Sequence, residues 1–123
     1  MSVPPLKECQ MEAVSLKTAE HYRWGEGCDG WHLAKMPGLS VIQEKVPAGR
    51  SEVRHFHNVS EQFFYVLSGE ATIETGEKRV TLHAGEGLSV PSRTPHQFRN
   101  ESTRDVDFLV VSAPPSHGDR VTV

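Results

Sequence analysis

The sequence predicts an all-β domain built as a sandwich or barrel of short strands. From residue 31 onward, short runs rich in Val, Ile, Phe and Thr are separated by Gly and Pro at intervals of about 8–12 residues, which is typical of such folds. No segment carries the sustained apolar stripe of an amphipathic helix. The length of 123 residues suits one domain with a single core.

The expected strands follow one another closely. They are 31–36, Leu39–Val46, 52–57, 62–68, Glu70–Thr75, Lys78–His83, 88–90, 96–99 and 106–112. The sequence Thr75-Gly76-Glu77 predicts a hairpin tip. Residues 21–30 contain three glycines and are expected to be irregular, and the end of the chain reads as a polar extension. We therefore divide the chain into an N-terminal arm (1–30), a β-barrel domain (31–113) and a C-terminal tail (114–123).

The charge of the chain excludes several classes of partner. The net charge is −3 and no run of Lys and Arg is present, so we expect neither nucleic acid nor a membrane surface as a partner. The first residues lack the apolar core of a secretory signal, and no apolar run approaches the roughly 20 residues of a membrane span. We expect a cytoplasmic protein in which Cys9 and Cys28 are reduced thiols.

Histidines at alternating positions are the strongest functional signal. His55 and His57 are separated by one residue, so on a strand both project from the same face. The same alternation groups Gln62 with Phe64 on the next strand, and it places His96 on a third strand. If these faces converge, three imidazoles and an amide meet in an apolar pocket, which is the usual form of a small-ligand site.

Eight residues recur at set spacings around these histidines. They are Gly49, His55, His57 and Gly69 in one segment, and Gly85, Pro91, His96 and Asn100 in a second. This pattern resembles the two motifs of the small single-domain cupins, and the 15 residues between the segments resemble the short spacer of microbial members. Over about residues 38–112 the resemblance implies a double-stranded β-helix, or RmlC-like jelly-roll barrel, preceded by an N-terminal extension. It also implies a homodimer.

The resemblance implies a divalent transition metal held by His55, His57, His96 and a fourth ligand. The ligand glutamate of the family stands seven positions before the closing glycine, where this chain has Gln62. Glu61 lies one residue earlier and would face the opposite side of the strand unless a bulge intervenes, so we expect Gln62 to point inward. Arg93 replaces a motif glycine, which predicts a different local turn and a cationic side chain at the barrel mouth.

A site with three histidines and an amide suits iron, manganese, nickel, zinc, copper or cobalt. Because the amide is neutral, a bound divalent cation keeps its full charge, so it should attract anionic ligands but be held less tightly. Four residues are candidates for the lining of the pocket: Phe64, Phe98, Phe108 and Gln43. The alternative for the three phenylalanines is packing in the core, and the alternative for Gln43 is a polar position at a strand edge. The histidines outside the motifs are expected to be structural or on the surface: His21, His32, His83 and His117.

Three functions remain open from the sequence. The first is a dioxygenase- or isomerase-like metalloenzyme that acts on a small polar or anionic organic molecule. The second is a non-catalytic module that binds or senses a small ligand, which the weakened ligand set favours. The third is a metal-free isomerase, which would need an Asp or Glu in the pocket, and the predicted strand faces offer no clear one.

Overall fold

The structure is a computed structural model that describes residues 11–123, and within that part of the chain it contains strands and no helix. Cys9 and the first ten residues of the predicted arm lie outside the described residues. The all-β class predicted from the sequence is confirmed. No helix in the described part is long and apolar enough to cross a membrane.

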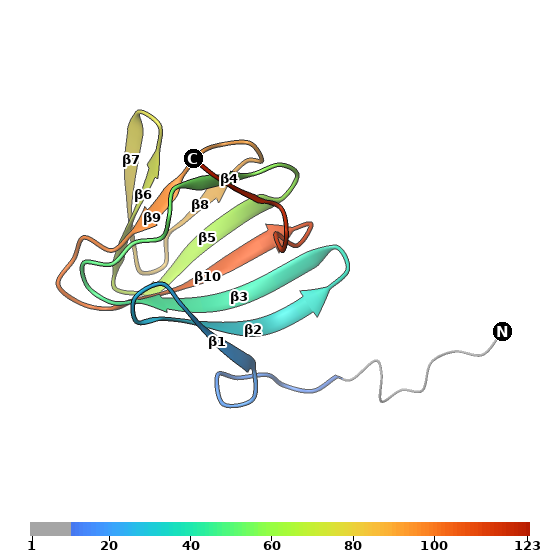
Figure 1. The fold of residues 1–123 in the computed structure, drawn as a ribbon. Coiled ribbons are helices and arrows are strands. Elements are labelled where there is room, and N and C mark those ends of the chain that lie inside the picture. The colour runs from blue at the N-terminus through green and yellow to red at the C-terminus, as the bar shows by residue number, and fades with distance from the viewer. Residues whose placement is uncertain (1–10) are drawn as a thin grey trace.

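All strand pairings in the described residues are antiparallel. The strands are β1 (Glu20–Trp24), β2 (Cys28–Met36), β3 (Leu39–Val46), β4 (His55–His57), β5 (Glu61–Ser68), β6 (Glu70–Thr75), β7 (Lys78–His83), β8 (Gly87–Val90), β9 (Gln97–Arg99), β10 (Val106–Ala113) and β11 (Arg120–Thr122). One sheet has the order β1-β2-β3-β10-β5-β8, and smaller sheets have the orders β7-β6-β9 and β11-β4. In Figure 1 the large sheet forms one wall, and β4, β6, β7 and β9 lie above it.

The boundaries of β3, β6 and β7 are those predicted, because Gly and Pro punctuate the chain at their ends. Gly76, with φ of 61°, forms the predicted hairpin tip between β6 and β7. The expectation of an irregular segment at 21–30 is wrong. There β1 pairs with β2 across a turn in which Gly25 and Gly27 have φ of 53° and 73°. The glycines that suggested irregular chain are the residues that let it reverse direction.

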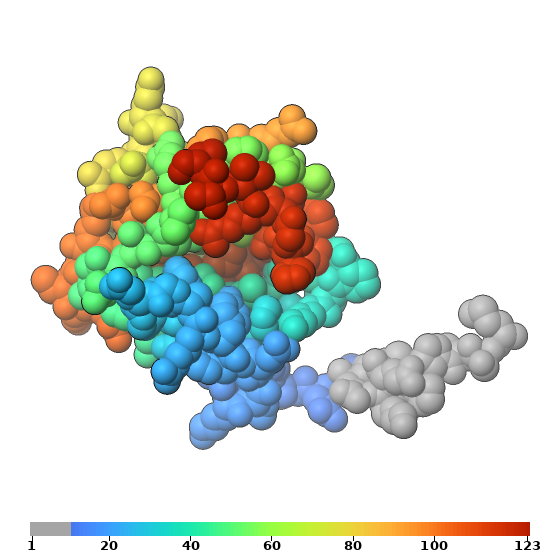
Figure 2. Space-filling model, in the orientation of Figure 1, coloured from blue at the N-terminus to red at the C-terminus, as the bar shows by residue number. Residues whose placement is uncertain are grey.

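The reading of residues 114–123 as a mere polar extension is also wrong. Residues Arg120–Thr122 form β11, which pairs with β4, the strand that carries His55 and His57. Figure 2 shows these C-terminal residues, in red, packed against the green segment that contains β4. Three residues are too few to display a period-two pattern, so this strand is defined by its partner rather than by its own sequence.

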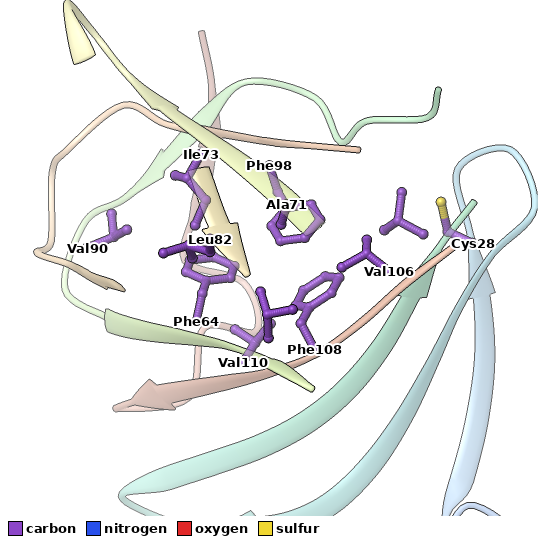
Figure 3. Close-up of a cluster of buried hydrophobic side chains, with 12 residues drawn as sticks. Cys28, Phe64, Ala71, Ile73, Leu82, Val90, Phe98, Val106, Phe108 and Val110 are labelled. Atoms are coloured by element: carbon purple, nitrogen blue, oxygen red, sulfur yellow. The ribbon is translucent and has the colours of Figure 1, made fainter. Parts of the chain in front are cut away.

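The core lies between the large sheet and the smaller sheet of β6, β7 and β9. Its buried side chains include Phe64, Phe98 and Phe108, which Figure 3 shows close together. The rings of Phe98 and Phe108 stack with centroids 3.9 Å apart, and each is 1% exposed. Burying a phenylalanine contributes roughly 1.5–3 kcal/mol, so this cluster holds the two sheets together beneath the histidines.

Candidate metal centre and ligand cavity

Three histidines from two segments come together in the barrel interior. His55 and His57 lie on β4, and His96 immediately precedes β9. His55 and His96 exchange backbone hydrogen bonds, with N–O distances of 3.0 and 2.8 Å, so this narrow antiparallel pair sets the spacing of the two rings. One possible ligand atom from each of the three rings lies within 4.8 Å of the others. All three side chains are buried.

Backbone carbonyls orient two of the rings. His55 Nδ1 donates to Val53 O at 2.7 Å, and His96 Nδ1 donates to Thr94 O at 2.8 Å. A proton on Nδ1 leaves Nε2 as the free lone pair, which is the arrangement that metal-binding histidines use. Burial lowers the pKa of all three histidines, to about 4 for His55, and so favours the neutral form that binds metal.

Several buried polar atoms at this place have no hydrogen-bond partner among the described residues. They are Nε2 of His96, both ring nitrogens of His57 and Oε1 of Gln62. Leaving a buried polar atom unpaired costs about 1–3 kcal/mol, so a cluster of them calls for an explanation. Imidazole nitrogens and an amide oxygen that converge without partners fit a divalent transition metal.

Gln62 faces the interior and Glu61 does not. Gln62 lies on β5 beside Ser112 of β10, and its Nε2 donates to Ser112 Oγ at 3.0 Å. That hydrogen bond leaves the Gln62 carbonyl oxygen free. Glu61 is exposed, as the alternation of the strand requires. The inward orientation agrees with the sequence-based expectation, and coordination by Gln62 stays a prediction.

Arg93 corrects one expectation. It takes φ of 62°, the left-handed conformation that glycine adopts readily, so the prediction of a different local turn is wrong. Its backbone N–H donates to His57 O at 2.6 Å, and this turn therefore helps to hold β4. Arg93 is not among the described residues that line the cavities described next.

An inner cavity of about 270 Å³ lies against His55 and His57, and His96 is not in its lining. Its lining includes His55, His57, Gln62, Phe64, Glu44 and Arg120. Of the other predicted pocket residues, Phe98 and Phe108 lie in the hydrophobic core. Gln43 is not in the cavity lining, whereas its neighbours Ile42 and Glu44 are. Gln43 pairs across the sheet with Trp31 and Leu109, on the opposite face from the cavity.

Two carboxyl groups in this cavity were missed by the sequence analysis, which found no clear pocket Asp or Glu. Glu44 accepts a hydrogen bond from Tyr22 Oη at 2.7 Å, and Glu52 accepts one from Phe98 N at 3.0 Å. Burial raises the pKa of Glu44 to about 7 and that of Glu52 to about 8. Glu44 could have been found by taking the opposite face of its strand, whereas Glu52 lies outside any strand and shows no pattern.

The tail completes the cavity. The Asp119 carboxylate accepts hydrogen bonds from the backbone N–H groups of Val59 at 3.0 Å and Ser60 at 2.8 Å, in the turn between β4 and β5. Arg120 lines the cavity, and its Nη2 donates to Val53 O at 3.2 Å. The positive charge of Arg120 opposes the rise in pKa of both Glu44 and Glu52.

A larger cavity of about 650 Å³ adjoins the inner one. The linings of the two cavities share Tyr22, Ile42, Ser116 and His117. His32 lines the outer cavity but not the inner one. His32 and His117, which were expected to be structural or on the surface, therefore both line the outer cavity. The shared residues come from β1, β3 and the tail, segments far apart in the chain.

Residues 42–112 match the cupin domain family. The chain belongs to this family. An uncharacterized protein of Methanocaldococcus jannaschii is 30% identical over 81 residues, which are 65% of either chain. Quercetin 2,3-dioxygenase of Bacillus subtilis is 35% identical over 72 residues, 57% of this chain and 21% of that enzyme. The chain thus spans less than two thirds of the length of these curated relatives.

Two solved structures illustrate the shared fold of this cupin. An RmlC-like cupin from Shewanella frigidimarina aligns with a TM-score of 0.76 at 19% identity, covering 86% of this chain and 93% of that one. A variant of Streptomyces PAC13 with uridine also has a TM-score of 0.76 at 19% identity, covering 93% and 91%. At this identity the likeness is one of fold, and it confirms the predicted RmlC-like barrel.

Proposed function

We propose that this cupin binds a divalent transition metal through His55, His57, His96 and Gln62 and acts as a metalloenzyme on a small polar or anionic organic molecule. The observation that carries the proposal is the set of unpartnered, buried atoms of His57, His96 and Gln62, together with the grouping of these two histidines with His55. Iron, manganese, nickel, zinc, copper and cobalt all suit such a donor set.

The charge of the cavity supports a polar or anionic ligand. With neutral donors only, a divalent cation would keep its full charge and supply a Lewis acid next to the inner cavity. Arg120 adds a positive charge on the same cavity. The apolar part of the wall, which includes Phe64 and Val110, lowers the local dielectric constant and would strengthen both attractions.

The relatives support an organic ligand. The Bacillus subtilis relative is a quercetin 2,3-dioxygenase, and the PAC13 structure contains uridine. We extend to this chain only what these two names share, a small organic molecule as the ligand. The homodimer, the division of the chain at residues 31 and 113, and the cytoplasmic location inferred from the sequence stay predictions.

A non-catalytic ligand-binding module is the second candidate. The neutral Gln62 in place of a carboxylate favours it, because the loss of a charged ligand weakens metal binding and leaves a polar cavity that could hold a ligand by hydrogen bonds alone.

Elemental analysis of the protein, purified without an affinity tag or chelator, tests the proposal. We expect close to one metal ion per chain, and loss of the metal in the double variant His55→Ala/His57→Ala. His83→Ala is the matched control, since His83 is exposed and lies on β7 away from the site. Iron would indicate oxygen chemistry, whereas zinc, nickel or manganese would indicate Lewis-acid chemistry.

The opposite result is equally clear. If the wild-type protein holds no metal, even after anaerobic reconstitution with iron(II), the metalloenzyme proposal fails and the ligand-binding module becomes the better account. A metal that persists in the double variant would place the binding site elsewhere.

A further inference from the structure

A row of residues across the large sheet places Tyr22 and Glu44 on the cavity face. Tyr22 of β1 pairs with Gly30 of β2, Gly30 pairs with Glu44 of β3, and Glu44 pairs with Phe108 of β10. Residues directly opposite one another in antiparallel strands share a face, and Phe108 points into the core. Tyr22, Gly30 and Glu44 therefore all face inward.

Gly30 is the residue that lets Tyr22 reach Glu44. A Cβ atom at Gly30 would lie 2.2 Å from Tyr22 Cζ and 2.5 Å from its hydroxyl oxygen, far inside van der Waals contact. The tyrosine ring therefore lies directly over Gly30 and crosses β2. It ends with its hydroxyl 2.7 Å from Glu44 Oε2. The glycine is required here for space, since its backbone conformation is not unusual.

The pair stands at the junction of the two cavities. Tyr22 lines both of them, and Glu44 lines the inner cavity together with His55, His57 and Gln62. A molecule that enters past Tyr22 and places an oxygen near the histidines would thus have Glu44 within the same space. Glu44 uses one carboxylate oxygen for the tyrosine hydroxyl, and its other oxygen has no hydrogen-bond partner among the described residues.

We propose that Glu44 is the proton acceptor for the molecule bound in the inner cavity, with Tyr22 and Gly30 as the residues that position it. The ligand class is a carbonyl compound with an acidic O–H or C–H group adjacent to the oxygen that faces the histidines, such as a 2-hydroxy ketone, an enolisable ketone or a hydroxamic acid. The inference rests on the proposed metal centre.

The step balances without a redox partner. The O–H or C–H bond of the ligand breaks, and its proton moves to a Glu44 carboxylate oxygen. The electron pair stays on the ligand oxygen or, for a C–H bond, moves into the adjacent carbonyl group to give an enolate. Glu44 becomes a neutral acid while the ligand becomes an anion, which Arg120 on β11 is placed to attract.

The surroundings of Glu44 suit this exchange. The groups that face it are Tyr22 from β1, Glu52 from the segment before β4 and Arg120 from β11. Burial raises the pKa of Glu44 to about 7, and the hydrogen bond from Tyr22 and the charge of Arg120 limit the rise. A carboxyl group with a pKa near neutrality can accept a proton and return it, which is the condition for general acid–base catalysis.

Proton counting on ligand binding tests the inference. Zinc-loaded protein is titrated with acetohydroxamic acid at pH 8 by calorimetry, in two buffers with different enthalpies of ionisation. In the wild type the bound hydroxamate anion should raise the pKa of Glu44 further, so that Glu44 keeps the proton and well below one proton per bound ligand reaches the solvent. Glu44→Gln should release about one proton per ligand, because the acceptor is gone.

Matched variants separate positioning from general damage. Tyr22→Phe keeps the ring over Gly30 but removes the hydroxyl, and we expect a proton count between those of wild type and Glu44→Gln. Gly30→Ala should do the same by displacing the ring, and Glu44→Asp should restore part of the uptake. Glu77→Gln, at the exposed tip of the β6–β7 hairpin, should behave as wild type. Circular dichroism and thermal unfolding establish that each variant is folded.

Three results would overturn the inference in different ways. An equal proton count in Glu44→Gln and wild type would remove Glu44 as the acceptor, and a change in Glu52→Gln instead would assign the role to Glu52. Failure of the zinc-loaded protein to bind the hydroxamate would show that the ligand class is wrong. Failure to retain zinc at all would overturn the proposed metal centre, and this inference with it.

Discussion

At the residue scale, three of the four side chains of the candidate metal centre are held through one polar atom while another is left free, and His57 has no such partner among the described residues. The Nδ1 atoms of His55 and His96 donate to backbone carbonyls, and the Gln62 amide nitrogen donates to Ser112. These bonds decide which atoms of the three side chains remain to bind a ligand: Nε2 of His55 and His96, and Oε1 of Gln62. Orientation by such partners is as important to a metal site as the ligands themselves.

Gln62→Glu should raise the affinity for metal by about tenfold or more, because it adds a negative charge at a ligand position without changing the shape of the side chain. Ser112 can then donate its hydroxyl proton to the carboxylate, so the fold should be retained. Competition with a chelator of known affinity measures the change. Gln62→Ala should weaken binding, and Glu61→Ala, on the exposed face, should leave it unchanged.

The ligand assignment would be rejected by the reverse pattern. Metal lost in Glu61→Ala but kept in Gln62→Ala would make Glu61 the ligand. Unchanged metal content in both variants would leave a centre of three histidines alone.

Glu44 should make the stability of the metal-free protein depend on pH. Its pKa is raised from 4.5 in the unfolded chain to about 7 in the fold, so the unfolded state loses its proton first as pH rises. The contribution of the neutral carboxyl group is therefore fully present below pH 4.5 and is lost as the pH rises through 7. Glu44→Gln removes this loss.

Relative to wild type, Glu44→Gln should therefore gain about 2 kcal/mol in the free energy of unfolding between pH 5 and pH 8, since each unit of pKa shift corresponds to about 1.4 kcal/mol and the cavity is partly solvated. Urea unfolding of both proteins at the two pH values measures the difference. Parallel pH dependences in the two proteins would contradict the raised pKa.

At the element scale, two glycines of the first motif lie between strands and differ in the space around them. Gly49 and Gly69 both have positive φ, 78° and 87°. A Cβ atom at Gly49 would meet nothing within 4 Å, whereas at Gly69 it would lie 2.5 Å from the carbonyl oxygen of Asp105. Gly69 links β5 to β6 where the chain before β10 passes close by, so it serves both conformation and packing.

Gly69→Ala should therefore destabilise the protein much more than Gly49→Ala. The backbone conformation alone costs about 1–2 kcal/mol for alanine, and the contact with Asp105 should raise the cost at Gly69 to about 3 kcal/mol or more. Urea unfolding of the two variants against wild type measures this. Similar losses in both would mean that the chain near Asp105 moves aside at little cost.

At the scale of the whole molecule, the site draws on segments that are distant in sequence. The histidines come from β4 and the residue before β9, Gln62 from β5, Glu44 from β3, and Arg120 from β11 near the end of the chain. The Asp119 carboxylate ties the tail to the turn after β4. Ligand binding at such a site depends on the folded barrel, so binding and folding must be linked.

Added metal should raise the Tm of the protein. At a free metal concentration about a hundredfold above Kd, linkage stabilises the fold by about 2.7 kcal/mol, which for a domain of this size corresponds to a rise of about 10 °C. Differential scanning calorimetry with and without zinc measures the shift. His55→Ala/His57→Ala should show none, and Asp119→Ala should show a smaller one because β4 is less well held. A full shift in the double variant would locate the metal elsewhere.

Local patterns predicted most of the strands. The bounds of β3, β6 and β7 follow from alternating side chains between Gly and Pro, which are properties of the segment itself. By contrast, β1 was hidden by its glycine turn, and β11 is too short to show alternation. Both strands exist because a partner strand is available, and a single segment does not reveal its partner.

The sequence by itself determined the histidine cluster and the inward face of Gln62, because motif spacing and period-two alternation are local. It identified the cupin fold for the same reason. Only the tertiary structure decided the rest of the cavity: that Glu44 rather than Gln43 faces inward, that Tyr22 reaches it over Gly30, and that Arg120 arrives from the tail. These depend on which strands pair and on the space between side chains, which arise from contacts between residues far apart in the chain.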